Sequence, residues 1–393
     1  MIKIIISLSI LLCPMSMAVA QESVDSVLSR IERNNTTLNA LRKAAEAERA
    51  SNHAELALEN PEVELGYHWG TPAAIGSRQT LSVGQSLDIA TISGSRRRLA
   101  KSQDVLVKWQ YRTERQSVML TARQLCVDAI YYNALLAKFS QRERIATEML
   151  RAGERRLQSG DGTQIDVNAL RLALADVQAE RLRAEGERSA VISQLVEMSG
   201  GEDVLITDTV FPLISLPTTF DEWYEEAAGS SPLLAYTRQN IDVSEQRLSV
   251  VRQEQLPRLK MGFVGEYVKG QNYQGVSVGV SLPLWGTRQR VRQAKAEVEA
   301  ASARHDDAVR SFVATVRALY LRQDALRQTA SVYAKALQEA DNIPLLRKAL
   351  DVGHISVQEY LTGAANRYEA ETLYLNAMRD WHSAYAELIS VSL

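Results

Sequence analysis

The chain has 393 residues, a formal net charge of −2 and a hydrophobic content of 46%. This near-neutral charge excludes wholesale attraction to nucleic acid or to another strongly acidic surface. The hydrophobic content excludes a wholly disordered chain, and the length suffices for two ordinary domains or one extended one.

The first twenty residues have the pattern of a secretory signal peptide. Lys3 gives a positive start, residues 4–12 are apolar, and the segment ends in Ala18-Val19-Ala20, an A-x-A cleavage site. We therefore predict a signal peptide over residues 1–20 and an exported mature protein.

The remainder of the chain restricts how the protein could be stabilised and how it could meet a membrane. Cys126 is the only cysteine after residue 20, so no internal disulfide is expected. No later run of 18 apolar residues occurs, so any contact with a membrane would need β-strands.

The sequence after the signal peptide is internally duplicated. Val63-Glu64-Leu65-Gly66 after Pro61 recurs as Leu259-Lys260-Met261-Gly262 after Pro257. The pattern Gly160-x-x-Thr163-x-x-Asp166 recurs as Gly353-x-x-Ser356-x-x-Glu359. The offset stays between 192 residues (Gly94 to Gly286) and 196 residues (Val63 to Leu259). Such a steady offset indicates two repeats. We place them at 21–200 and 219–393, joined by a linker over 201–218 that is expected on the outside.

Alternating apolar and polar residues predict two β-strands in each repeat, at about 61–70 and 79–89, and at about 258–268 and 275–284. Such strands have one apolar and one wet face, and their length suits a tilted crossing of a lipid bilayer. Aromatic side chains stand at the strand ends, where interfacial girdles belong: Tyr67, Trp69, Tyr267 and Trp285. Alternation alone leaves open a sheet packed on a soluble core.

Long helices fill most of the remaining sequence. Residues 95–157 contain no proline and predict a helix of ~95 Å. Residues 287–352 predict a matching helix, kinked or broken near Pro344. Apolar steps of four and three indicate coiled-coil seams at Val118, Ala122, Leu125, Ala129, Tyr132, Leu136 and Phe139, and at Phe312, Val316, Leu319, Gln323, Leu326, Ala330 and Tyr333.

Two shorter helices, at 24–58 and 163–199, are each too short to match the long helix of the first repeat. Stacked end to end, the two helices roughly match the length of that long helix. Each repeat is therefore expected to pair one long helix with one composite helix.

Four strands cannot close a barrel, and open strand edges are not tolerated in lipid. Two chains would give eight strands, whose interior is normally filled by side chains, whereas three chains would give twelve strands and a lumen. The smallest conducting assembly is therefore a homotrimer. Small polar residues on one strand face suit a wet bore: Ser82, Gly84, Ser86, Ser277, Gly279 and Ser281.

The order helix, hairpin, long helix and helix, written twice, resembles the TolC family of outer-membrane efflux proteins. The most specific matches are Ser281-Leu282-Pro283-Leu284-Trp285-Gly286 and the segment Val352 to Leu361. The resemblance implies a mainly α-helical fold with transmembrane β-strands: a trimeric duct with a twelve-stranded β-barrel and a long coiled-coil α-barrel. It also implies the outer membrane of a Gram-negative bacterium, a periplasmic adaptor and an inner-membrane transporter of the RND or ABC type.

Two glycine turns mark the far tip of the helices. Gly160 and Gly353 are expected to end the long helices, while Thr163 and Ser356 are placed to N-cap the returning ones. The resemblance implies that these turns dock the adaptor.

Asp166 and Glu359 follow the two caps by three residues, and in a trimer they would supply six carboxylates. The family has a constricting ring with an aspartate at the position of Glu359, so a periplasmic gate is implied. A second acid of that ring is Thr362 here. The alternative is simple compensation of the helix dipole.

No enzymatic site, cofactor or metal site is expected. The five histidines fall in separate segments, and no GxSxG, P-loop or GxGxxG motif occurs. The basic run Arg96-Arg97-Arg98 with Lys101 fits a collar near lipid headgroups better than nucleic acid. The main alternative function is a periplasmic coiled-coil adaptor or structural scaffold, and a small-solute porin would not explain the long helices.

Overall fold

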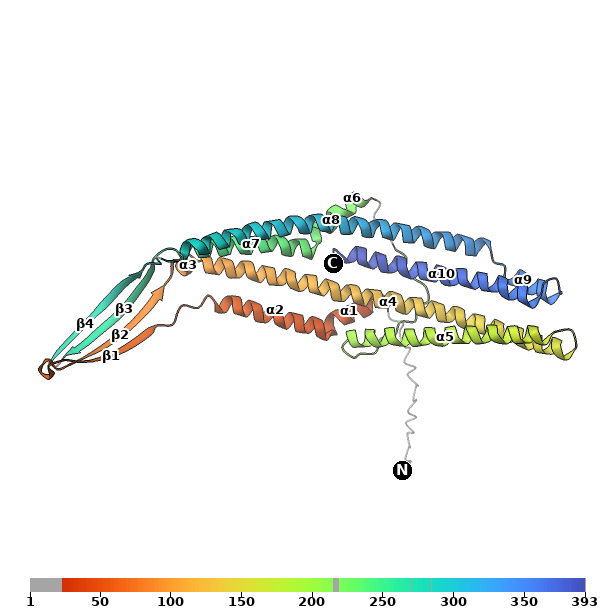
Figure 1. Cartoon of the computed structure of the whole chain (residues 1–393), viewed down its shortest axis with the longest axis horizontal. Coiled ribbons are helices and arrows are strands. Elements are labelled where there is room, and N and C mark those ends of the chain that lie inside the picture. Colours follow the sequence, from red (N-terminus) through yellow and green to blue (C-terminus); the bar gives the residue numbers. More distant parts are fainter. Residues whose placement is uncertain (1–22, 215–218, 269, 284, 393) are drawn as a thin grey trace, which may run out of the picture.

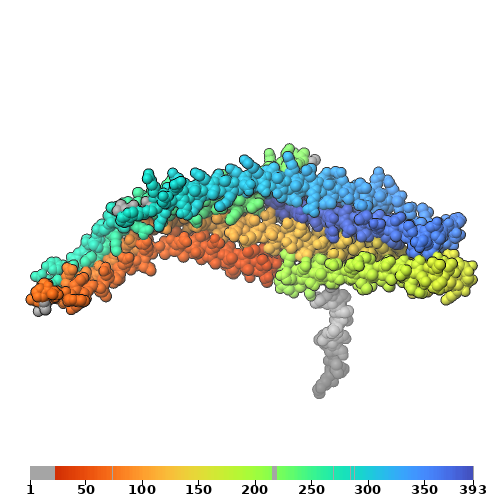
Figure 2. Space-filling model, in the orientation of Figure 1, coloured from red at the N-terminus to blue at the C-terminus, as the bar shows by residue number. Residues whose placement is uncertain are grey.

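The computed structural model describes residues 23–214, 219–268, 270–283 and 285–392. The predicted signal peptide at 1–20 lies outside the described residues. The molecule is a curved rod (Figures 1 and 2). A four-stranded sheet forms one end, and the turns that connect α4 to α5 and α9 to α10 form the other. No described helix is both long enough and apolar enough to span a membrane.

The first repeat begins with α1 (Val24–Asn34) and α2 (Thr36–Ala54). The predicted continuous helix 24–58 is therefore wrong in two respects: it breaks at Asn35 and ends at Ala54. Asn35 causes the break because its side chain caps α2, with Oδ1 accepting from the Leu38 amide at 2.9 Å. Its amide nitrogen also donates to the carbonyl of Met198 at 2.9 Å, which joins this break to the end of another helix.

The sheet follows as β1 (Glu62–Trp69) and β2 (Ser77–Leu87), with a 3-10 turn, η1 (Ala73–Ile75), between them. A short α3 (Ile89–Ile92) then leads into α4 (Ser95–Gln158) and α5 (Gln164–Met198). β2 begins and ends two residues before the predicted range of 79–89. The 64 residues of α4 span ~96 Å at ~1.5 Å per residue, as expected from the absence of proline.

The second repeat contains α6 (Phe220–Ser230), α7 (Pro232–Gln253), β3 (Arg258–Val268), β4 (Gln271–Ser281), α8 (Thr287–Glu339), α9 (Ile343–Asp351) and α10 (Val357–Ser390). β3 agrees with its predicted bounds, whereas β4 begins at Gln271 and ends at Ser281 instead of spanning 275–284. The predicted interruption near Pro344 is confirmed: the helix breaks at residues 340–342, and Pro344 occupies the first turn of α9.

The composite helices are confirmed. α2 and α5 both pack along α4, and α7 and α10 both pack along α8, each pair nearly end to end (Figure 1). The two predicted seams lie in these contacts. Ala122, Ala129 and Phe139 are buried on α4, and Phe312, Val316 and Ala330 are buried on α8.

The linker is less peripheral than expected. Its residues Val204, Ile206 and Phe211 are buried, so this part of 201–218 lies inside the helical body; residues 215–218 are outside the described residues. Asn133 of α4 anchors it, donating to the carbonyl of Ile206 at 2.9 Å. The proline and glycine content of the linker suggested an outer loop. Composition does not show which apolar linker residues become buried against the helices.

Candidate functional site

The sheet has two chemically different faces. Its strands pair antiparallel in the order β1-β2-β3-β4, so the hairpins of both repeats form one sheet. Directly paired residues share a face. One cross-strand row contains Val63, Val83, Phe263 and Val276, and the adjacent row on the other face contains Glu62, Gly84, Gly262 and Ser277. The alternation predicted from the sequence therefore combines the two repeats on common faces.

The apolar face is largely uncovered in the single chain. Val276 is 88% exposed and Leu65 is 79% exposed, and Val278 and Met261 are exposed beside each other. A contiguous exposed apolar surface of this kind marks contact with a membrane or a partner.

The predicted aromatic residues lie at both ends of the sheet. Tyr67 and Tyr267 share one cross-strand row, through Gln79, near the end that is remote from the helices, and Trp69 lies just beyond. Trp285 follows β4 near the helices and is 87% exposed. These exposed positions are compatible with two interfacial girdles, one at each end of the sheet. Leu284, at the end of the predicted last strand, lies outside the described residues.

The opposite face is more charged than the small polar residues predicted. Lys260 pairs with Glu62 at 2.5 Å, and Arg78 lies 3.8 Å from Glu266. Both pairs connect the first repeat to the second. The sequence reveals these charges, but only the register brings them together.

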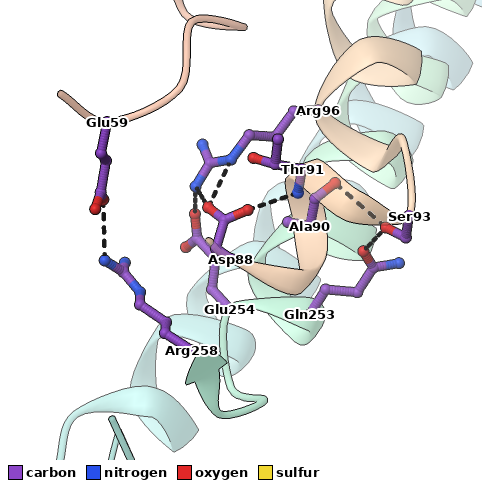
Figure 3. Close-up of polar contacts among 9 residues, drawn as sticks. All are labelled: Glu59, Asp88, Ala90, Thr91, Ser93, Arg96, Gln253, Glu254 and Arg258. Carbon is purple, nitrogen blue, oxygen red and sulfur yellow. Dashed lines mark hydrogen bonds and ion pairs between the residues drawn. The ribbon is translucent and has the colours of Figure 1, made fainter. Parts of the chain in front are cut away.

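A polar junction joins the sheet to the helices (Figure 3). Asp88 caps α3 by accepting from the Thr91 amide at 2.6 Å, and its second oxygen accepts from Arg96 at 2.7 Å. Arg96 also donates to Glu254 of α7 at 2.8 Å, while Ser93 donates to Gln253. Although burial opposes ionisation, the bonds from Thr91 and Arg96 lower the pKa of Asp88 below its usual value.

The junction corrects one part of the predicted basic collar. The guanidinium of Arg96 is committed to two carboxylates and joins the repeats, so it is not available to headgroups. Arg97 and Lys101, in contrast, are exposed on α4. Arg258 and Glu59 make a further bridge between the repeats at 3.2 Å (Figure 3).

The two tip turns have the same construction. Gly160 and Gly353 have φ values of 82° and 74°, in the left-handed region that glycine adopts without strain. The next amide, of Asp161 or His354, bonds back to the carbonyl of Arg156 or Ala349 at 2.9 Å. Together with the glycine amides, these bonds form a Schellman motif at each turn.

The predicted caps are present at both turns. Thr163 and Ser356 each accept from the amide three residues on, and Asp166 and Glu359 accept from the amides of the capping residues at 3.3 and 2.7 Å. Both acids are therefore engaged in capping boxes. The backbone and hydroxyl bonds from Ser356 lower the pKa of Glu359.

A groove brings parts of the two turns together. It has a volume of about 450 Å³ and is lined by Gly162 and Asp166 from the first repeat and Ser356 from the second, with Arg155, Arg156 and Arg347 around them. Glu359, Gly160, Thr163 and Gly353 do not line this groove, so the structure unites only part of the predicted tip residues.

The sequence analysis did not predict a cluster of charged side chains that lies between α4 and α10. Arg142 of α4 is 6% exposed and donates to Glu371 of α10 at 3.0 Å, and Lys138 and Arg367 flank the same carboxylate. No local pattern could have revealed a contact between residues 229 positions apart. Among the described residues, no group of three or more His, Cys, Asp or Glu side chains could hold a metal ion.

Comparison with known proteins gives consistent similarities. Residues 223–392 match the family model described as "Outer membrane efflux protein". The "Proteases secretion protein PrtF" of Dickeya chrysanthemi is 24% identical over 308 residues, covering 74% of this chain. The match spans only 64% of that protein, less than two thirds of its length.

Solved channel structures share the fold across nearly the whole chain. CusC superposes with a TM-score of 0.79 at 12% identity, covering 95% of this chain and 92% of CusC. The outer membrane protein VceC of Vibrio cholerae gives a TM-score of 0.76 at 13% identity, with 94% and 96% covered. The Campylobacter jejuni CmeC outer membrane channel gives 0.70 at 16% identity, with 94% and 85% covered. At these identities the likeness demonstrates a common fold.

Proposed function

We propose that this chain is a member of the outer membrane efflux protein family, the TolC family, whose model its residues 223–392 match. In this proposal it is a passive exit duct in the outer membrane of a Gram-negative bacterium. The observation that carries the proposal is the two-faced sheet at one end of a rod of long helices. An apolar face suits lipid and a charged, hydrated face suits a bore. The protein acts as a conduit and not as an enzyme.

The duct is a homotrimer in this proposal. One chain supplies four strands with open edges at β1 and β4, and bilayer lipid offers those edges no hydrogen-bonding groups. Pairing β1 of one chain with β4 of the next closes a twelve-stranded β-barrel from three chains. The long helices would then continue the bore into the periplasm.

The periplasmic tip is the proposed contact with other proteins. The turns at Gly160–Thr163 and Gly353–Ser356 are exposed at the end of the rod remote from the sheet, which suits docking of a periplasmic adaptor. An inner-membrane transporter of the RND or ABC type would deliver the cargo. The similarity to a protease secretion protein supports a secreted polypeptide as one cargo class.

Asp166 and Glu359 are the proposed acids of the periplasmic gate. Their placement at the tip supports this role, while their capping boxes supply a structural role that does not require a gate. The two roles are compatible at Glu359, because the bonds from Ser356 that form the capping box favour its charged form.

The alternative of a periplasmic coiled-coil adaptor or scaffold accounts for the helices but not for the sheet. A water-soluble protein would have to leave Val276, Val278 and their neighbours uncovered, at a cost of ~25 cal/mol per Å². The exposed face therefore favours the duct.

Two adjacent residues of β4 test the function. Val278 pairs with Met261 on the apolar face, and Ser277 pairs with Gly262 on the polar face. Val278→Arg should cost ~2–4 kcal/mol near mid-membrane and lower the yield of heat-sensitive trimer in unheated detergent extracts. Ser277→Arg is the matched control: it should leave the trimer intact and change single-channel conductance in planar bilayers. Equal effects of both variants, or a soluble monomer for the unaltered chain, would contradict the duct.

A further inference from the structure

The two long helices both begin beside the sheet with a run of positive charge. The starts of α4 and α8 lie at the same end of the sheet (Figure 1). The first nine residues of each helix, 95–103 and 287–295, contain four basic residues and no acidic residue. In α8 the excess ends there, because residues 296–339 contain six basic and six acidic residues. The positive charge is therefore concentrated at one level of the rod, in both repeats.

Most of these basic side chains are available to a partner outside the chain. Within the described residues, six of them are exposed and make neither an ion pair nor a side-chain hydrogen bond, and we refer to them as the junction cations: Arg97, Lys101, Arg288, Arg290, Arg292 and Lys295. Three acids of the junction are already engaged. Asp88 and Glu254 accept from Arg96, and Glu59 accepts from Arg258. The exposed charge at this level is therefore mainly positive.

The junction cations also repel one another. Arg97 and Lys101 on α4 are four residues apart, as are Arg288 and Arg292 on α8, so each pair shares one helix face. Lys295 continues the second stripe three residues later. Like charges at this spacing destabilise a helix, and a negatively charged surface beside both stripes would relieve the repulsion.

The residues around the junction cations follow the order of layers in one half of a bilayer. The apolar face of the sheet comes first, then one exposed apolar side chain in each repeat, Ile92 and Trp285, and then the cations. Such side chains mark the boundary between hydrocarbon and headgroups. Nine helical residues cover ~13 Å at ~1.5 Å per residue. This depth matches a headgroup layer of ~5–8 Å plus a screening length of ~8 Å, so the cations lie at the level of lipid phosphates.

We propose that the junction cations bind the headgroups of anionic glycerophospholipids in the membrane leaflet that faces the periplasm. The net negative charge of such a headgroup complements the cations, whereas a zwitterionic headgroup carries its own cation that competes with them. The inference rests on the proposed function, because it requires the sheet to lie in lipid. It adds a class of lipid that holds the duct at a fixed depth.

Quenching of tryptophan fluorescence by brominated lipids tests the proposal on the full-length protein in vesicles. Trp285 is the reporter, because it is exposed and stands three residues before Arg288. Its share of the signal is obtained by subtracting the signal of Trp285→Phe. At about 0.1 M salt, brominated phosphatidylglycerol should be preferred over brominated phosphatidylcholine by about fivefold or more. This factor corresponds to ~1 kcal/mol, the interaction of one cation with an anionic surface.

Two double variants of α8 isolate the contribution of the junction. Arg288→Gln with Arg292→Gln should reduce the preference for phosphatidylglycerol to near onefold. Arg304→Gln with Arg310→Gln is the matched control, since both arginines are exposed on the same helix but lie farther from the sheet. The control should keep the preference. Loss of the preference in both variants, or in neither, would overturn the proposal.

A salt titration of the unaltered protein keeps the test decisive if the Arg288–Arg292 variant fails to insert. Raising the salt from about 0.1 M to about 1 M shortens the screening length from ~10 to ~3 Å and should remove most of the preference. A preference that persists at high salt, or none at low salt, would overturn the proposal.

The same variants distinguish lipid from the bore and from failure of the duct. A changed ion selectivity of the channel, with no lipid preference at Trp285, would assign the cations to the bore and overturn the proposal. In that case the trimer still conducts, so the proposed function would stand. An unaltered chain that does not insert into vesicles at all would contradict both.

Discussion

The acids at the tip turns accept hydrogen bonds at the ends of their own helices. A test of the gate must therefore separate their charge from this capping role. Asp166 and Glu359 accept from the amides of Thr163 and Ser356, and the bonds to Ser356 hold the pKa of Glu359 below its usual value. At neutral pH Glu359 is therefore charged and can attract cations at the same time as it caps its helix.

Replacing both acids, Asp166→Asn with Glu359→Gln, removes the charge and retains a capping oxygen. We expect weaker inhibition of single-channel current by multivalent cations added on the periplasmic side. Ser356→Ala with Thr163→Ala is the converse control: it keeps the charges, costs ~0.5–2 kcal/mol per cap and should leave the inhibition in place. Unchanged inhibition in the double acid variant would reduce the two residues to helix caps.

His382 predicts a pH dependence of stability. It is 4% exposed, stacks on Phe211 of the linker with ring centres 4.7 Å apart, and burial lowers its pKa to about 4. Between that value and the usual ~6.5 the unfolded chain binds more protons than the folded chain. The stabilisation is complete above pH ~6.5 and falls as the pH drops towards 4, by ~3 kcal/mol per chain at most.

His382→Phe keeps the ring stack and removes the titrating group, so the thermal midpoint should change less between pH 7 and pH 4.5. His354→Gln, at an exposed position in the tip turn, serves as the control and should leave the pH profile unaltered. Asp25, Arg123 and Asp208 line the same pocket as His382. A profile that persists in His382→Phe would exclude His382 as its source.

Among the elements, the tip turns are where a change should separate docking from folding. A Cβ atom added at Gly160 or Gly353 would meet no atom within 4 Å, and a longer side chain can extend from there into solvent, so the main cost is that of the left-handed backbone, ~1–2 kcal/mol. Gly160→Gln with Gly353→Gln should therefore leave a folded trimer in the membrane and abolish export.

Gly186→Gln supplies the matched control for the tip variants. Gly186 lies on the exposed surface of α5 away from the tip, again with nothing within 4 Å. Export should be normal in this variant. Normal export in the double tip variant would place the adaptor elsewhere on the rod.

Periodicity predicted the elements well where buried and exposed positions alternate regularly along a strand or helix. The strands and α4 follow from alternation and from the absence of proline, and the seams on α4 and α8 coincide with buried residues. Periodicity could not predict the break at Asn35. The residues on both sides of it have a helical pattern, and the break depends on the capping bond of one side chain. The bounds of β4 differed because Gln271 and Asn272 pair with β3 without any apolar signal.

At the scale of the whole molecule, duplication in the sequence predicted two equivalent halves, and the tip turns bear this out. The contacts between the two repeats do not follow from the duplication. The Arg142–Glu371 cluster, the Lys260–Glu62 pair and the Asp88–Arg96–Glu254 junction each join different elements of the two repeats. Such contacts depend on the fold that brings distant segments together, so they could be found only in three dimensions.

The open edges of the sheet also bear on the order of events during biogenesis. Each backbone group left unpaired in hydrocarbon costs several kcal/mol, and β1 and β4 each present a row of them. A lone chain therefore faces a prohibitive barrier to entering lipid, and in the proposed homotrimer insertion would coincide with the meeting of three chains. Its rate should rise more steeply than in proportion to chain concentration, so gene dosage would control the number of finished ducts out of proportion to the amount of protein made.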